Sequence, residues 1–318
     1  MMPTMKTQSL GKSSLVSTRL AYGNMRSVGT WTPSDVTPEI RTRAMHAHIA
    51  AFEAGYNHFD TADIYCAGVC EEVLGQTLRE VRGMRERIIV ATKCGIRFKG
   101  NPNPDSPARY DFSPDYIRSC CDASLKRLGV DTIDLFHLHR PDVLMNPLDI
   151  APVFDDLHKA GKVKVFAVSN FLPTTLSALQ KHLNVPIEVN QVEIHLGRLD
   201  PFVDGTLDQC LERTMTPTAW SPLGGGWLGA GRTVQPNNPN YAKWTLLQQL
   251  LDKTGADHGV SRTVVALAWL MKHPSGIIPI VGSASPQNIR EAAKADDVNL
   301  SREEWYRIYV AARGQTMP

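Results

Sequence analysis

Residues 133–170 read IDLFHLHRPDVLMNPLDIAPVFDDLHKAGKVKVFAVSN, and this stretch contains the repeating unit on which the fold prediction depends. Residues 133–139 are an apolar run of strand length. Residues 147–161 show the spacing of an amphipathic helix that ends at a glycine, and a second apolar strand follows at residues 163–170. A strand, a helix and another strand in this order predict a βαβ unit with two parallel strands.

The same alternation continues over the whole chain and gives eight strands. We expect them at residues 19–23, 58–62, 87–95, 133–139, 163–170, 187–194, 217–223 and 277–283. We expect helices between and after them at residues 37–55, 70–81, 113–129, 147–161, 174–183, 206–214, 241–255, 261–273 and 285–296. Eight such units in 318 residues fit a closed (β/α)₈ barrel, or TIM barrel, better than an open sheet.

The two ends of the chain add smaller elements to this barrel. Residues 6–17 read as a β-hairpin around Gly11 that could plug the barrel floor, and residues 301–314 form an extra helix with a capping box. No linker or charge block interrupts the pattern. The prediction is one α/β domain over residues 1–318, with an N-terminal β-hairpin and extra C-terminal helices.

Composition narrows the function classes. A net charge of +2 gives no case for nucleic acid or membrane binding, and no apolar run reaches the length of a membrane helix. The start of the chain lacks the apolar core of a signal peptide, so we expect a cytoplasmic protein. The six cysteines form no C-x-x-C motif, and we expect reduced thiols and no metal site.

Polar residues cluster where the predicted strands end, which is where the active sites of such barrels lie. These residues are Asp60, Lys93, His139, Ser169, Asn170, Gln191, Trp220 and Ser221.

Four side chains at three successive strand ends suit proton transfer to or from a carbonyl group. A tyrosine has a pKa of about 10, and a lysine beside it favours the phenolate and should lower that pKa. An aspartate keeps the lysine charged, and a histidine could hold a carbonyl oxygen. Asp60, Tyr65, Lys93 and His139 provide this set. It lacks a hydride or electron source, so the chemistry requires a cofactor.

Two other motifs point elsewhere: the first is rejected, and the second is disfavoured. Residues 224–229, GGGWLG, match a dinucleotide fingerprint, but no helix or acidic residue follows at the required spacing. His137 and His139 form an H-x-H pair of the kind that barrel metallohydrolases use, but Ser, Asn and Gln end the next strands and are poor zinc ligands. His137 is therefore interpreted as a core histidine.

The chain resembles the aldo-keto reductases from its first strand to its last helix, and within them the YdhF-type branch of bacterial oxidoreductases. The resemblance lies in FDTADIYCAG, VATKCG, DTIDLFHLHRPD, GKVKVFAVSNF, NQVEIH, AWSPLGGG and IIPIVGSASPQNIRE. It implies an NAD(P)H-dependent enzyme that reduces an aldehyde or ketone to an alcohol, or that catalyses the reverse oxidation. Tyr65 would be the proton donor, Lys93 and Asp60 would tune it, and His139 would orient the carbonyl.

The resemblance also implies a set of cofactor contacts. Ser169, Asn170 and Gln191 would bind the nicotinamide carboxamide, and Trp220 would stack on its ring. The remaining contacts would be Ser221, Pro222, Leu223, Gly224 and Gly225 at the pyrophosphate; Gly282, Ser283, Ser285 and Asn288 at the adenosine end; and Gly23, Asn24 and Met25 after the first strand.

The chain departs from the family pattern at two positions. NADPH-specific members carry a lysine at the position of Gly282 and an arginine at that of Asn288. Both basic residues are missing here. The family resemblance alone favours NADP(H), and NAD(H) is the alternative. Two alternatives stay open at this point: a cofactor-binding regulatory or scaffold barrel, and a metal-dependent hydrolase. The identity of the small-molecule substrate and the oligomeric state are undetermined.

Overall fold

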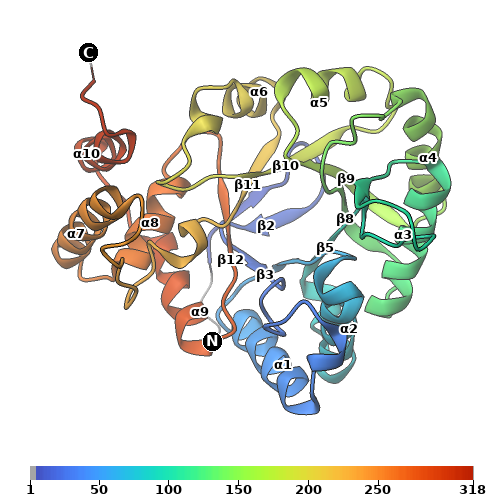
Figure 1. Ribbon diagram of the computed structural model, residues 1–318, viewed down its shortest axis with the longest axis horizontal. Helices are drawn as coiled ribbons and strands as arrows, with labels where there is room; N and C mark the ends of the chain where they lie inside the picture. Colours follow the sequence, from blue (N-terminus) through green and yellow to red (C-terminus); the bar gives the residue numbers. More distant parts are fainter. Residues whose placement is uncertain (1–4, 318) are drawn as a thin grey trace.

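Eight parallel strands close into a barrel in the computed structural model, which describes residues 5–317 (Figure 1). The last strand pairs with the first, so the ring has no open edge. In chain order the strands are β3 (Ala21–Gly23), β4 (His58–Asp60), β5 (Ile89–Cys94), β8 (Ile133–Leu138), β9 (Val163–Ser169), β10 (Ile187–Glu193), β11 (Thr216–Trp220) and β12 (Ile278–Val281). The predicted (β/α)₈ barrel is confirmed.

Eight helices surround the strands in the order that the sequence predicts (Figure 1). They are α1 (Pro38–Glu53), α2 (Val69–Glu80), α3 (Pro114–Leu128), α4 (Pro147–Lys159), α5 (Pro173–Gln180), α6 (Thr206–Arg213), α8 (Arg262–Met271) and α9 (Pro286–Ala293). Two more helices, α7 (Tyr241–His258) and α10 (Arg302–Arg313), lie outside this ring at one side. The expected capping box of α10 is present, with Ser301 and Glu304 bonded reciprocally. The division into a single domain stays a prediction.

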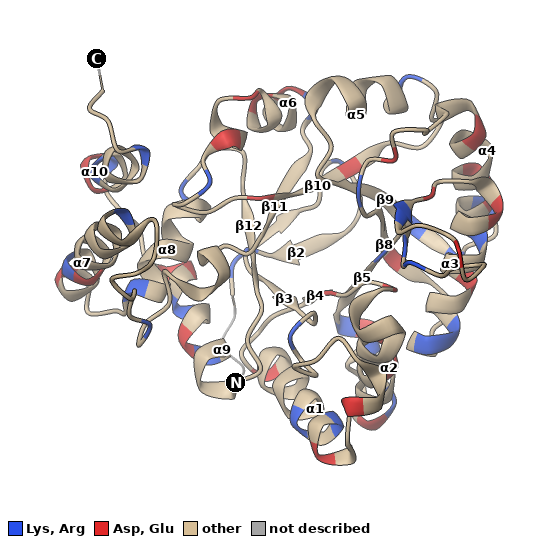
Figure 2. Ribbon diagram, viewed as in Figure 1, with Lys and Arg blue, Asp and Glu red and all other residues tan. Residues whose placement is uncertain are grey.

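Charged side chains are carried mainly by the outer helices and loops, with both signs interspersed (Figure 2). The strands are buried on both faces, as expected where helices cover a parallel sheet. A charge within a strand is therefore an exception that needs a partner. Within residues 5–317, no helix combines the length and the apolar character needed to cross a membrane.

One small element was missed from the sequence. The loop after β5 contains a second hairpin, formed by β6 (Ile96–Arg97) and β7 (Arg109–Tyr110). Strands of two residues are too short to show the alternation on which strand prediction relies.

The N-terminal hairpin closes the floor of the barrel, as predicted. Strands β1 (Thr7–Ser9) and β2 (Val16–Thr18) pair antiparallel, and β2 is seen through the ring in Figure 1. Leu10 is fully buried among the apolar residues of the barrel interior. At the turn, the Gly11 N–H donates to Thr216 Oγ1 over 2.9 Å and the Lys12 N–H donates to Glu188 Oε2 over 2.7 Å. Gly11 has φ +59, a conformation that glycine adopts without strain.

We predict that Leu10→Ala destabilises the protein by about 2–4 kcal/mol, because it leaves a cavity between the plug and the barrel interior. Denaturant unfolding would measure the change. Leu144→Ala serves as the control, since Leu144 is 87% exposed and its loss should change stability by less than about 0.5 kcal/mol. Equal effects of the two substitutions would contradict the structural role of the plug.

Candidate active site

A cavity of about 380 Å³ opens at the carboxyl ends of the barrel strands. This size lies within the usual range for small-ligand sites, roughly 300–1,000 Å³. Most of the predicted site residues line it: Gly23, Met25, Asp60, Tyr65, His139, Ser169, Asn170, Gln191, Trp220, Ser221, Pro222, Leu223, Gly225 and Gly282.

Lys93 lies beneath this cavity and is fully buried. Its ammonium donates to Asp60 Oδ2 over 2.7 Å, to the Thr61 carbonyl oxygen over 2.7 Å and to the Tyr65 hydroxyl over 3.4 Å. A lysine ammonium has three N–H groups, and each of them has an acceptor here. The acceptors come from the end of β4 and the turn that follows it, so one short segment surrounds the charge.

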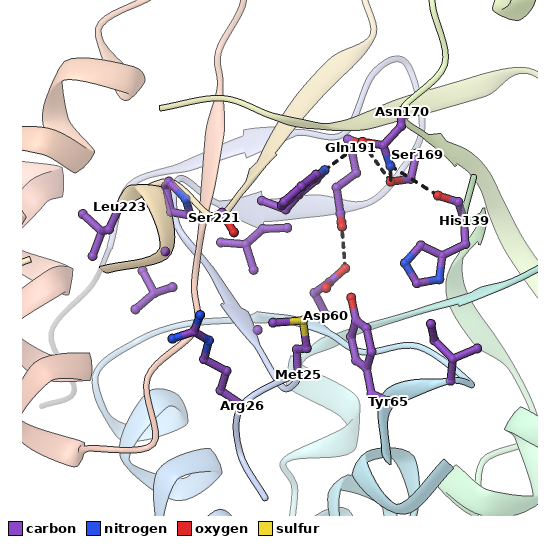
Figure 3. Close-up of a pocket in the computed structure, with 18 of the residues that line it drawn as sticks. Met25, Arg26, Asp60, Tyr65, His139, Ser169, Asn170, Gln191, Ser221 and Leu223 are labelled. Atoms are coloured by element: carbon purple, nitrogen blue, oxygen red, sulfur yellow. Dashed lines mark hydrogen bonds between the residues drawn. The ribbon is translucent and has the colours of Figure 1, made fainter. Parts of the chain in front are cut away.

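Asp60 is in turn held on both carboxylate oxygens. Lys93 occupies Oδ2, and the Gln191 side-chain amide donates to Oδ1 over 2.8 Å (Figure 3). Two donors therefore fix the orientation of this carboxylate. Asp60 is thus the partner of the lysine, as predicted from the sequence.

Burial and charge oppose each other in this group. Burial disfavours the charged form of Lys93, yet Asp60 and Tyr65 outweigh it and hold the pKa of the lysine above its usual value. For Tyr65 the strongest influence is burial, which raises the pKa, while Lys93 lowers it; the pKa lies above its ordinary value on balance. The expectation that Lys93 brings the pKa of Tyr65 below 10 is therefore wrong, because the lysine only partly offsets desolvation of the phenolate.

His139 faces Tyr65 across the cavity floor (Figure 3). The two ring centroids are 5.9 Å apart and the rings are nearly perpendicular. Burial, together with the nearby charges of Lys93 and Arg140, holds the pKa of His139 well below its usual value. The imidazole is therefore neutral at pH 7 and has one N–H to donate. His137 is a buried core histidine, with Nδ1 3.3 Å from the Thr92 carbonyl oxygen.

A third group of polar side chains forms the upper wall of the cavity. Asn170 donates from its side-chain amide to Ser169 Oγ over 2.7 Å and accepts from Trp220 Nε1 over 2.9 Å. Asn170 and Ser221 adopt positive φ values of 62° and 51°, which cost energy for residues other than glycine. The two hydrogen bonds hold the Asn170 amide and the Trp220 indole at the cavity wall. There they can bind a planar amide and stack on an aromatic ring.

Three glycines leave space at the other end of the cavity. A Cβ added to Gly225, Gly226 or Gly282 would meet no atom within 4 Å. Gly282 has no positive φ, so neither local packing nor its backbone requires a glycine there. Open backbone of this kind allows a phosphate-bearing ligand to approach closely. The residues present thus fit the phosphates of a dinucleotide at this end.

Several predicted contacts lie elsewhere. Asn24 is fully buried and donates to the Asp60 carbonyl oxygen, and Gly224 is buried against Trp244 and His195. Ser283, Ser285 and Asn288 lie beyond the cavity, at and within the N-terminal turn of α9; the Ser285 hydroxyl accepts from the Asn288 N–H.

Other residues that line the cavity were missed from the sequence. They are Arg26, Ile64, Ile96, Arg140, Ile280 and Val281. Arg26 and Arg140 each directly follow a predicted site residue, Met25 and His139. Extending each of these two groups of predicted site residues by one position would have found both arginines.

The barrel and its strand-end residues define a class: an enzyme that performs acid–base chemistry beside a site suited to a nucleotide cofactor. Comparison with known proteins narrows this class. The Aldo/keto reductase family model matches residues 19–312. The chain is 41% identical over 315 residues to 6-dehydroglucose reductase of Novosphingobium aromaticivorans, covering 97% of this chain and 96% of that protein.

The similarity extends to a second relative and to solved structures. Oxidoreductase YdhF of Escherichia coli is 35% identical over 266 residues, which cover 84% of this chain and 86% of that protein. The glycerol dehydrogenase AKR11B4 from Gluconobacter oxydans has the same fold, with a TM-score of 0.83 at 23% identity over 98% of this chain and 97% of that one. The protein belongs to the aldo-keto reductase family and is an oxidoreductase acting on carbonyl groups.

Neither open alternative gains support from these findings. The family match favours an enzyme over a scaffold. No group of three or more metal-ligating side chains comes together within residues 5–317. The expected cytoplasmic location stays a prediction.

We predict strong energetic coupling between Asp60 and Lys93. Asp60→Asn and Lys93→Met should each destabilise the protein by about 3–5 kcal/mol, because each leaves one buried charge without its partner. The loss of stability in the double variant should be smaller, by at least ~2 kcal/mol, than the sum of the losses in the two single variants. Denaturant unfolding of the four proteins in the cycle would measure this.

A matched cycle at Arg118 and Asp156, an exposed pair 2.7 Å apart, provides the control. Exposed pairs couple by less than about 1 kcal/mol. Similar coupling energies in the two cycles would show that burial adds nothing to the catalytic pair.

Proposed function

We propose that this enzyme reduces an aldehyde to an alcohol with a nicotinamide cofactor, with Tyr65 as the proton donor and a sugar aldehyde related to 6-dehydroglucose as the substrate. The observation that carries the proposal is the contact of Lys93 with both Asp60 and Tyr65 at the cavity floor. The cofactor, when bound, supplies the hydride for the carbonyl carbon.

Tyr65 completes the reduction by giving its phenolic proton to the carbonyl oxygen. The phenolate that forms is stabilised by the Lys93 ammonium, whose Nζ is 3.4 Å from the phenol oxygen. Before the reaction the phenol is protonated, because burial keeps its pKa above the usual value. Lys93 therefore acts mainly when negative charge develops on Tyr65, which is where a catalytic interaction lowers the barrier.

His139 orients the substrate. A neutral imidazole can donate one hydrogen bond to a carbonyl oxygen without protonating it. Its place opposite Tyr65 lets both donors converge on one oxygen atom. The alcohol product leaves with the proton of Tyr65, and solvent returns a proton to the phenolate.

The cofactor contacts are assigned from the family resemblance together with the lining of the cavity. Ser169, Asn170 and Gln191 would hold the carboxamide, and Trp220 would stack on the nicotinamide ring. Residues 221–226 would bind the pyrophosphate, and the N-terminal turn of α9 would contact the adenosine end. Gln191 then links the cofactor to catalysis, because its amide also fixes Asp60.

Aldo-keto reductases use NADPH or NADH, and we propose that NADPH is preferred here. Ser283, Ser285 and Asn288 offer hydrogen-bond donors at the adenosine end, but neither position 282 nor 288 carries a positive charge. A 2′-phosphate is bound best by arginine or lysine. The preference should therefore be modest.

The substrate proposal rests on two relatives named 6-dehydroglucose reductase. They are 41% and 34% identical to this chain, and each comparison covers more than nine-tenths of both proteins. The cavity offers Trp31 as an exposed aromatic surface beside Tyr65, with ring centroids 6.2 Å apart. Aromatic rings of this kind pack against the C–H faces of sugars.

We predict that Tyr65→Phe lowers kcat for 6-dehydroglucose by about 10²–10⁴-fold, because only the proton donor is lost. Fluorescence titration should give a Kd for NADPH within about twofold of the wild type. A panel of other aldehydes and ketones, assayed in parallel, tests the substrate. If other carbonyl compounds are reduced and 6-dehydroglucose is not, the substrate assignment is wrong but the assignment as a carbonyl reductase stands.

The pH profile provides a second readout of the same prediction. The reductive kcat/KM of the wild type should stay level through neutral pH and fall only above about pH 10, as the phenol ionises. The residual activity of Tyr65→Phe should lack this alkaline fall. Full activity of the variant would exclude Tyr65 as the donor, and no binding of either nucleotide would exclude the function.

We also predict that Asn288→Arg tightens NADPH binding by roughly 10-fold and leaves NADH binding within about twofold, because the new guanidinium can pair with the 2′-phosphate. Titration with both nucleotides would measure the change. Asn288→Gln, which adds length without charge, is the control. Equal tightening toward both nucleotides would place position 288 away from the 2′-phosphate.

A further inference from the structure

Arg26 is a charged residue of the cavity wall for which the mechanism above has no use. It follows β3 and lines the cavity together with Gly225, Gly226 and Gly282. Its side chain is exposed, and within residues 5–317 it forms no ion pair with a carboxylate. An unpaired guanidinium at the wall of a ligand cavity is available to an anion.

The direction of Arg26 separates it from the catalytic end of the cavity. Figure 3 shows its guanidinium turned toward the segment that carries Ser221 and Leu223, and away from Tyr65 and His139. That segment and the three open glycines are where backbone can approach a phosphate closely. Arg26 thus faces the same space from the opposite wall.

The charge balance of the cavity adds to this. Asp60 is the single carboxylate among the residues that line it, and Lys93 already neutralises Asp60 at 2.7 Å. The other lining cation, Arg140, lies over the Trp220 ring, with Cζ 5.2 Å from its centroid. Arg26 therefore leaves an excess positive charge at the glycine-rich end.

We propose that Arg26 binds the pyrophosphate of the nicotinamide cofactor. This inference rests on the proposed function, since it assumes that a dinucleotide occupies the cavity. Arg140 lies over Trp220, so Arg26 is the cation of the cavity lining that is left to meet the pyrophosphate beside residues 221–226. A guanidinium can pair with two phosphate oxygens at once, which a lysine ammonium cannot do with the same geometry.

The test is fluorescence titration of purified Arg26→Gln with NADPH and with NADH. Hydrogen bonds to charged groups contribute enough for a roughly 10-fold rise in Kd when one partner is lost. Because both nucleotides contain the pyrophosphate, both Kd values should rise by a similar factor. Arg26→Lys should fall between wild type and Arg26→Gln. Added salt should weaken NADPH binding more steeply in the wild type than in Arg26→Gln.

The control is Arg307→Gln, which removes the same charge from an exposed position of α10, a helix that lies outside the ring around the barrel (Figure 1) and contributes no residue to the cavity. Its Kd values should stay within about twofold of the wild type, because exposed charges are screened by salt. Circular dichroism and thermal unfolding would establish that each variant is folded.

Each outcome has one meaning. A similar rise for both nucleotides supports the proposal. Unchanged Kd values in Arg26→Gln overturn it. A rise for NADPH alone also overturns it and assigns Arg26 to the 2′-phosphate. If the wild type binds neither nucleotide, that result contradicts the proposed function itself.

Discussion

The site depends on one buried positive charge. Lys93 has no exposed surface, so its ammonium exchanges water for three protein acceptors or else loses its proton. Asp60, the Thr61 carbonyl and Tyr65 are those acceptors, and all belong to the end of β4 and the turn after it. Pairing of β4 with β5 sets the distance between the charge and these groups. The catalytic tyrosine is thus positioned by the need to satisfy the lysine.

The backbone bears the energetic cost of this arrangement. Five residues other than glycine have positive φ within residues 5–317, and four of them either line the cavity or directly follow Tyr65. Cys66 and Ala67 directly follow Tyr65, and Asn170 and Ser221 hold the amide wall. The fifth, Thr214, ends α6. Strain of this kind persists only where the surrounding structure requires it, and here it places the phenol over Lys93 and the amides opposite.

The barrel could be predicted from the sequence, and so could the gathering of Asp60, Tyr65, Lys93 and His139 at one end of it, because both follow from regular patterns. Strand and helix periods repeat eight times, and polar residues such as Lys93 at the end of an apolar run are conspicuous. The short β6–β7 hairpin shows no such period. The predicted direction of the pKa shift of Tyr65 was wrong. Burial, which a sequence does not give, raises this pKa by more than the neighbouring lysine lowers it.

The cofactor end of the cavity was harder to predict for a different reason. Asp60 and Lys93 lie on paired strands, whose register fixes their neighbours, whereas the contacts predicted at the adenosine end lie on a loop and a helix end. Ser285 illustrates this: its hydroxyl accepts from the Asn288 N–H at the start of α9, a capping role that sequence alone does not separate from ligand binding. Arg26 is the converse case, an ordinary loop residue until the fold places it opposite the open glycines.

This division between strands and loops bears on how the family can vary. Neither Lys93 nor Asp60 can be lost alone without leaving a buried charge unpaired, so these two positions are expected to change together. A phosphate at the cavity mouth makes no such demand, because it needs positive charge from any wall within reach. The loop after β3 can therefore supply that charge without disturbing the buried pair. The geometry of catalysis is fixed by burial, and the affinity for the cofactor is set separately at the rim.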